Sequence, residues 1–124
     1  MFWRIVKCWR RARIMLGIYA DKGKSEHFLF QLSAPITAQE FYEKVIPLHY
    51  QYDPFATQYR GQIFSVRKLE GPMQYHVRLY KDGAISGHYE HNYEFEMRGH
   101  VKGEDCRTMV EGEYAELKVA LGVS

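Results

Sequence analysis

The sequence predicts an α+β domain in which an antiparallel sheet of about five strands carries two or three helices on one face. Residues 73–97 alternate between apolar and polar side chains around an Asp-Gly turn, which is the pattern of a β-hairpin. Residues 37–46 and 105–121 instead repeat their apolar side chains at helical spacing. With 124 residues, the chain has the length of a single domain. The expected sheet consists of two hairpins, the second of which extends to a three-strand meander.

The composition is that of a globular protein, with 46% hydrophobic and 26% charged residues. No run approaches the roughly 20 apolar residues of a transmembrane helix, and the charges within residues 1–13 do not fit a signal peptide. We therefore expect a cytoplasmic protein without a membrane span. Cys8 and Cys106 lack zinc-finger spacing, so we expect free thiols, with a disulfide between them as the alternative.

Basic residues are concentrated in residues 1–20, which contain no acidic residue, although the whole chain has a net charge of only +2. The candidate nucleic-acid-binding residues are Arg4, Lys7, Arg10, Arg11 and Arg13. Residues 1–12 fit a basic amphipathic helix better than a strand, although neither pattern is clean. Such a helix can contact nucleic acid or an anionic membrane, or it can cover the sheet and leave its arginines in water.

The first hairpin is predicted from two apolar segments, residues 13–20 and 26–33, joined by a turn at residues 21–25. In the second of these strands, Phe28 and Phe30 are expected to share one face with Leu32 because side chains alternate along a strand.

A helix follows, and its start is well marked. The segment from Thr37 to Glu40 fits a capping box, in which each side chain bonds to the backbone of the other residue. Phe41 and Val45 then lie on the same helix face, and Pro47 is expected to end or kink the helix near Ile46.

Residues 49–60 have no clean periodicity and are predicted to form a loop. Loops of this length in compact domains often carry function. The candidate partner-binding residues are Tyr50, Tyr52, Phe55, Tyr59 and Arg60, a mixture typical of recognition surfaces. The alternative is that these aromatic side chains fold back onto the core.

Three strands, at residues 62–70, 73–80 and 85–97, are predicted to form the meander. A three-residue turn over residues 81–83, with Gly83 in the left-handed region, keeps apolar residues opposite apolar residues. A register shifted by one residue would mix the two faces. The chosen register sets His76 opposite His88 and Gln74 opposite Glu90.

The last element is predicted to be a helix that begins near Asp105 and stops at Gly122. Its apolar positions include Met109, Leu117 and Leu121, which are expected to pack on the sheet. Glu113 is among the residues expected to face solvent.

The most chemically suggestive cluster is His76, His88 and Glu90, because imidazole and carboxylate groups bind divalent transition metals. The alternative is that these side chains simply lie on the solvent side of a half-exposed sheet. No nucleophile-elbow, dinucleotide-binding, P-loop or zinc-protease motif occurs in the sequence.

These observations favour a small, non-enzymatic binding or assembly protein whose partner is a protein or a second copy of the chain. It would contact this partner through the tyrosine-rich loop and the polar face of the sheet. In a dimer, Glu90, Glu94 and Glu96 would face Arg10 and Arg11 of the other copy. A nucleic-acid-binding protein that uses the basic segment is the first alternative. A metal-dependent enzyme that uses the His/Glu cluster is the second, and in that case a divalent transition metal would be the cofactor.

Overall fold

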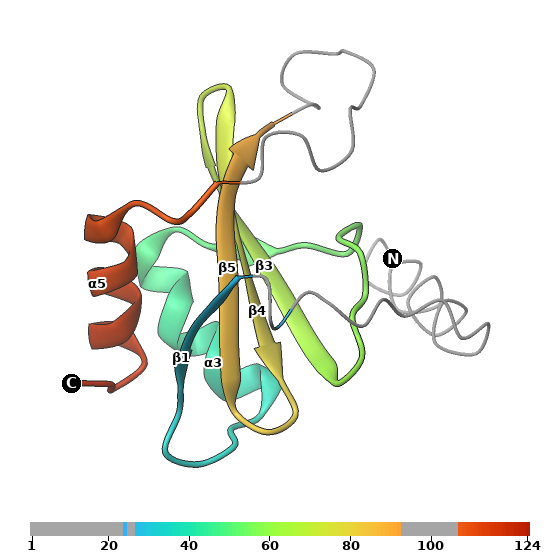
Figure 1. Cartoon of the computed structure of the whole chain (residues 1–124), viewed down its shortest axis with the longest axis vertical. Coiled ribbons are helices and arrows are strands. Elements are labelled where there is room, and N and C mark those ends of the chain that lie inside the picture. The colour runs from blue at the N-terminus through green and yellow to red at the C-terminus, as the bar shows by residue number, and fades with distance from the viewer. Residues whose placement is uncertain (1–23, 25–26, 93–106) are drawn as a thin grey trace.

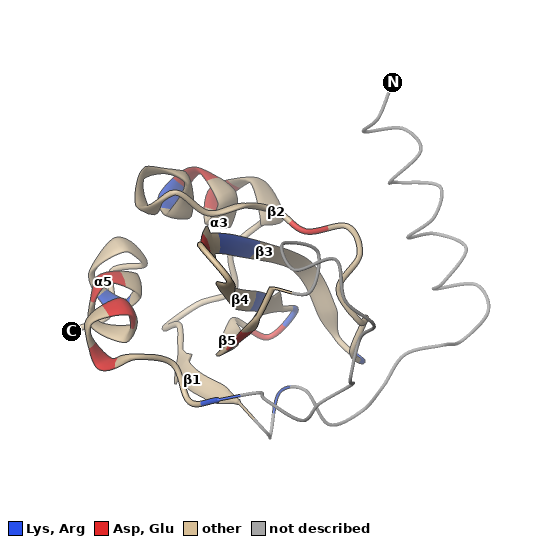
Figure 2. Cartoon of the chain, turned by 90° about the horizontal axis from the view of Figure 1, so that it is seen from above, with Lys and Arg blue, Asp and Glu red and all other residues tan. Residues whose placement is uncertain are grey.

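The computed structural model describes residue 24 and residues 27–92 and 107–124. Its five strands form one antiparallel sheet in the order β1-β5-β4-β3-β2, and the helices α3 and α5 lie on the same side of that sheet (Figures 1 and 2). The strands are β1 (Phe28–Gln31), β2 (Gln51–Tyr52), β3 (Gln62–Glu70), β4 (Met73–Tyr80) and β5 (Ala84–His91), and the helices are α3 (Ala38–Val45), the 3-10 turn η1 (Ile46–Leu48) and α5 (Glu111–Ala120). The predicted α+β class is confirmed. None of the helices described here is long and apolar enough to cross a membrane.

The capping box at the start of α3 is confirmed. Thr37 Oγ1 accepts a hydrogen bond from the Glu40 amide at 3.0 Å, and the Thr37 amide donates to Glu40 Oε1 at 3.1 Å. Phe41 and Val45 are fully buried against the sheet. Pro47 then lies in η1, where the helix tightens before it ends at His49, whose φ is 74°. The expected effect of Pro47 is therefore also observed.

The register of the meander is as predicted. β3 pairs with β4 so that Val66 faces Val77, and β4 pairs with β5 so that His76 faces His88. Gly83 has a φ of 85°, the left-handed conformation that the three-residue turn requires. The predicted extent of the last strand differs in part, because β5 ends at His91 and Asn92 lies outside it. Residues 93–97 lie outside the described part of the chain.

The first predicted hairpin is described only through its second strand, because residues 13–20 lie outside the described part of the chain. That strand is β1, and it pairs with β5. The prediction that Phe28 and Phe30 share a face is wrong. The register shifts between them, so Phe28 is 49% exposed whereas Phe30 is buried. A bulge of this kind adds a residue and breaks the alternation locally.

The C-terminal helix is shorter than predicted. α5 begins at Glu111, because Arg107 instead pairs with Tyr89 of β5, with backbone N–O distances of 2.9 and 2.7 Å. This bridge continues the edge of β5 beyond β1 and holds residues 107–110 outside the helix. The predicted stop at Gly122 is confirmed by its φ of 75°. Asp105, the predicted cap, lies outside the described residues, as do Cys8 and Cys106.

The hydrophobic core lies between the helices and one face of the sheet. Its fully buried side chains include Phe41, Val45, Val66, Val77, Leu79, Ile85 and Leu117. One charged group enters this layer, because Glu113 is buried and not exposed as predicted. Its carboxylate accepts a hydrogen bond from the Tyr50 hydroxyl at 2.7 Å and pairs with Lys68 Nζ at 2.8 Å. The sequence pattern missed these contacts because Tyr50, Lys68 and Glu113 come from three distant segments.

Candidate metal centre

The polar face of the sheet, opposite the helices, is also largely buried. Its buried polar residues include Asp53, Ser65, Gln74, Arg78, Ser86 and His88. The alternative in which His76, His88 and Glu90 lie on the solvent side of a half-exposed sheet is therefore wrong. Part of the cover comes from residues that follow β2: Tyr59 lies under Arg78, with the guanidinium carbon 4.9 Å from the ring centroid. The ring of His27 lies 4.8 Å from that of His88.

The three predicted metal-ligating residues meet on this face. His76 lies on β4, and His88 and Glu90 lie two residues apart on β5, so strand alternation points all three to the same side. One ligand atom from each residue lies within 4.8 Å of the other two. His88 Nε2 is 2.6 Å from Glu90 Oε1, and His76 Nδ1 is 3.5 Å from the same oxygen. The antiparallel register thus brings His76, which is distant in sequence, next to His88 and Glu90.

A fourth residue, Asp53, completes the cluster and was not identified from the sequence. Its carboxylate Oδ2 lies 3.4 Å from His76 Nε2. Backbone bonds hold Asp53 beside β3, because its amide donates to the Ser65 carbonyl at 3.0 Å and its carbonyl accepts from Ser65 Oγ at 2.9 Å. Its other carboxylate oxygen, Oδ1, accepts from the Phe55 amide at 3.1 Å. Asp-Pro at positions 53 and 54 was the only local signal for a fixed turn.

Burial controls the charge of the cluster. It lowers the pKa of His76 to about 4, although Asp53 and Glu90 act in the opposite direction. Burial also opposes ionisation of Glu90, but the hydrogen bond from His88 holds the pKa of Glu90 below its ordinary value. Near neutral pH the cluster therefore contains a neutral His76 and an ionised Glu90. These are the protonation states in which both side chains bind metals.

Several nitrogen atoms in the cluster are buried without a hydrogen bond. They are both ring nitrogens of His76 and Nδ1 of His88. Buried polar atoms of this kind are uncommon because each one loses its bonds to water without replacement. An ion that accepts a nitrogen lone pair would compensate part of this cost.

The spacing of the cluster suits a small divalent ion. Two ligands of a tetrahedral ion, each bonded at about 2.0–2.2 Å, lie roughly 3.3–3.6 Å apart. The separation of 3.5 Å between His76 Nδ1 and Glu90 Oε1 already matches this value. The shorter contact between His88 Nε2 and Glu90 Oε1 is a hydrogen bond, and it must widen by less than about 1 Å to admit an ion.

The candidate partner-binding residues do not form one surface. Tyr50 is buried and bonded to Glu113, and the ring of Tyr52 is stacked on Phe64 at 5.0 Å. Tyr59 is half-buried beside Arg78, as described above. Only two of the five candidates, Phe55 and Arg60, are exposed. The alternative, in which these aromatic side chains fold back onto the domain, therefore describes most of this loop.

The basic segment cannot be placed in the same way. Arg4, Lys7, Arg10, Arg11 and Arg13 all lie outside the described residues, as do Glu94 and Glu96 of the expected dimer contact. Their proposed roles stay predictions from the sequence. Glu90, the third acid of that contact, lies in the His/Glu cluster with its side chain 13% exposed.

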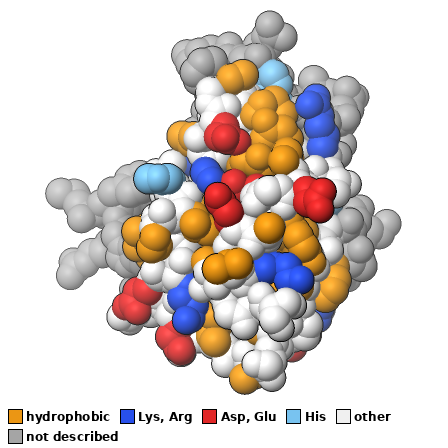
Figure 3. Space-filling model, turned by 90° about the vertical axis from the view of Figure 1, so that its left-hand side faces the viewer, with side chains coloured by type: hydrophobic (Ala, Val, Ile, Leu, Met, Phe, Trp, Pro, Cys, Tyr) orange, Lys and Arg blue, Asp and Glu red, His pale blue; other side chains and the backbone are white. Residues whose placement is uncertain are grey.

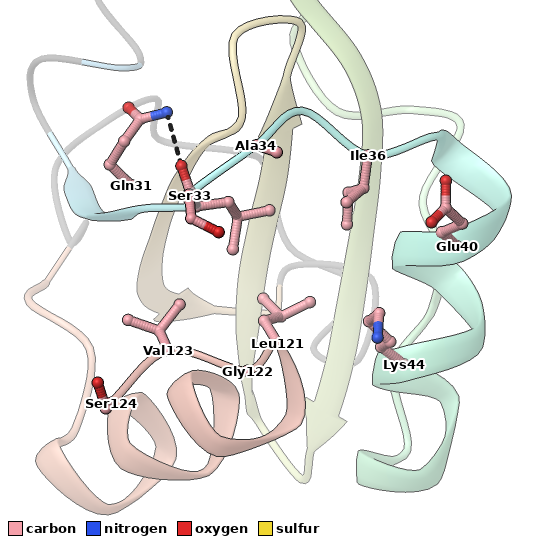
Figure 4. Close-up of a pocket in the computed structure, with 11 residues that line it drawn as sticks. Gln31, Ser33, Ala34, Ile36, Glu40, Lys44, Leu121, Gly122, Val123 and Ser124 are labelled. Atoms are coloured by element: carbon pink, nitrogen blue, oxygen red, sulfur yellow. Dashed lines mark hydrogen bonds between the residues drawn. The ribbon is translucent and has the colours of Figure 1, made fainter.

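A cavity of about 410 Å³ lies away from this cluster, between the β1–α3 connection and the C-terminal residues (Figure 4). Ile36, Leu121 and Val123 line it, and α3 contributes Glu40 and Lys44. The Glu40 carboxylate already serves the capping box of α3. One of the two charged groups that line the cavity is therefore already engaged within the protein.

No family model, curated protein or solved structure matches this chain. The surface on the α5 side mixes apolar, acidic and basic side chains among the described residues (Figure 3).

Proposed function

We propose that the protein binds a divalent transition-metal ion through His76, His88 and Glu90. The observation that carries the proposal is the convergence of the three ligand atoms within 4.8 Å on a buried sheet face. Two imidazoles and one carboxylate suit Zn²⁺ and its neighbours in the first transition series. The proposal keeps the protein in the class of small binding proteins that the sequence favoured. Of the two binding regions expected from the sequence, the aromatic loop and the polar sheet face, it uses the sheet face alone.

Binding changes the proton arrangement in a defined way. Glu90 is ionised and has no proton to donate, so in the metal-free protein His88 Nε2 donates to Glu90 Oε1. A bound ion would take the place of this proton, which would pass to His88 Nδ1 or to water. His76 Nδ1 and Glu90 Oε1 would both offer a lone pair to the ion, so binding would relieve an unfavourable contact between two acceptors.

The direct test is a titration of chelator-treated full-length protein with Zn²⁺ by calorimetry and with Co²⁺ by absorption spectroscopy. We expect one ion per chain and a Co²⁺ spectrum without a thiolate charge-transfer band, because the ligands are nitrogen and oxygen. At about 100-fold excess over the dissociation constant, the ion should stabilise the fold by about 2.7 kcal/mol. Absence of binding, or a thiolate band, contradicts the proposal.

A matched pair of histidine variants shows whether the assigned ligands are the correct ones. His76→Asn removes a ligand of the cluster, and His49→Asn removes an exposed imidazole at the end of η1, where Asn tolerates the positive φ. We expect only His76→Asn to abolish the thermal shift produced by Zn²⁺. Equal loss in the two variants, or no loss in either, would assign the ion to another site.

A further inference from the structure

The carboxylate of Asp53 faces the ring nitrogen of His76 that points away from the other ligands. The contact at 3.4 Å is between Oδ2 and Nε2, while Nδ1 on the opposite edge of the ring faces Glu90 Oε1. A neutral imidazole has one N–H group and one lone pair, and its neighbours decide which nitrogen carries the proton. His76 therefore lies between two carboxylates that compete for a single proton.

The contacts of the two carboxylates decide this competition. Glu90 Oε1 is already engaged with His88 Nε2 at 2.6 Å. Asp53 Oδ1 is engaged with the Phe55 amide, which leaves Oδ2 turned toward His76. The proton of His76 is therefore better placed on Nε2, toward Asp53, and the lone pair on Nδ1, toward Glu90.

We propose that Asp53 is a positioning residue that fixes His76 in the tautomer with the proton on Nε2 and thereby presents Nδ1 to a metal ion. The metal-binding part of this inference rests on the proposed function, whereas the tautomer part concerns the metal-free protein. A carboxylate behind a histidine ligand holds the ring in orientation and increases the basicity of the coordinating nitrogen. The rigid attachment of Asp53 to Ser65 suits this role.

Asp53→Asn tests the inference because it should invert the tautomer. The amide oxygen of the variant keeps the bond from the Phe55 amide, so its NH₂ group takes the place of Oδ2 and faces His76 Nε2. A donor at this position favours a lone pair on Nε2 and moves the proton to Nδ1. Nitrogen NMR of the His76 ring distinguishes the two tautomers without any metal.

Asp82→Asn is the matched control. Asp82 also accepts a bond from the amide two residues later, that of Ala84 at 3.0 Å, but it lies in the exposed β4–β5 turn and pairs with Lys24. Both variants therefore remove one negative charge from a similar turn. We expect wild type and Asp82→Asn to carry the proton of His76 on Nε2, and Asp53→Asn to carry it on Nδ1.

The metal titration provides the second measurement. Asp53→Asn should weaken Zn²⁺ binding by about 10- to 100-fold, whereas Asp82→Asn should not change it.

A second variant is needed if Asp53→Asn does not fold. Asp53→Ser retains an acceptor for the Phe55 amide but no carboxylate, and it should lose both the tautomer preference and the affinity for Zn²⁺. An unchanged tautomer or unchanged affinity in the folded variant overturns the inference. If wild type binds no ion, the proposed function fails, and the NMR comparison still decides the role of Asp53.

Discussion

The two faces of the central sheet are both buried, but by different means. Val66 and Val77, paired across β3 and β4, lie in an apolar layer beneath α3 and α5. Ser65 and Arg78, which pair one position away, point to the opposite face and are equally buried among polar groups. The same strands thus supply both layers by alternation. Alternation along a strand therefore predicts which face of the sheet each residue occupies, but it does not predict whether the polar face is exposed to solvent.

The difference between the faces should appear in their energetics. Burial of apolar surface stabilises the fold by about 25 cal/mol for each Å² removed from water. Burial of polar groups without hydrogen bonds has a free-energy cost. Three ring nitrogens of His76 and His88 are buried without a hydrogen bond. We therefore expect the apolar face to supply stability and the polar face to supply binding.

The largest effect should follow truncation on the apolar face. Leu79→Ala removes a fully buried side chain and should lower the free energy of unfolding by about 2–5 kcal/mol. His76→Leu, on the polar face of the same strand, should change it by less than about 1 kcal/mol without metal, because it removes nitrogens that lack partners. Chemical denaturation of both variants measures the contrast. Equal losses would show that the faces contribute alike.

Acidification should destabilise the protein through the polar face. The pKa of His76 is about 4 in the folded protein and about 6.5 in the unfolded chain, so its contribution is fully present above pH 6.5. Stability should fall between about pH 6.5 and pH 4, by up to about 3 kcal/mol. Below an ordinary pKa of 4.5, protonation of Glu90 acts in the same direction because its folded pKa is lowered.

The measurement is the free energy of unfolding of metal-free protein at intervals across this pH range. His76→Leu serves as the control, and it should lack the slope between pH 6.5 and pH 4. A variant that keeps the full slope would place the responsible group elsewhere in the molecule.

A smaller effect is expected where a charged pair crosses into the apolar layer. Glu113→Gln leaves Lys68 without its counter-charge, and it should cost about 2 kcal/mol because the Lys68 side chain is 15% exposed and keeps some contact with water. Tyr50→Phe, which removes only the hydroxyl donor to Glu113, should cost about 1 kcal/mol. Thermal denaturation of the two variants compares them. A Glu113→Gln variant as stable as wild type would show that the pair contributes nothing net.

The local parts of the fold were predictable from sequence. The capping box at Thr37 and the turn at Gly83 depend on residues a few positions apart, and both were located correctly. The same turn fixes the register of β4 and β5, so the approach of His76 to His88 followed from it. Three of the four residues of the candidate site could therefore be predicted from the sequence.

The missing parts depend on contacts between distant segments. Asp53 reaches His76 only because β2, a strand of two residues, pairs with β3, and so short a strand leaves no periodic pattern. Glu113 occupies a position that a helical wheel assigns to solvent, and its burial follows from Lys68 on β3 and Tyr50 before β2. The bulge after Phe28 is likewise set by its partner strand.

The order of strands in the sheet has a consequence for the path of folding. β3, β4 and β5 are consecutive in the chain and adjacent in the sheet, whereas β1 reaches β5 from the far end of the described segment. Contacts between neighbours in sequence close small loops and form with the lowest loss of chain entropy. His76, His88 and Glu90 all belong to this local unit, and Asp53 joins it only when β2 pairs. The three residues of the candidate site can therefore come together before the sheet is complete.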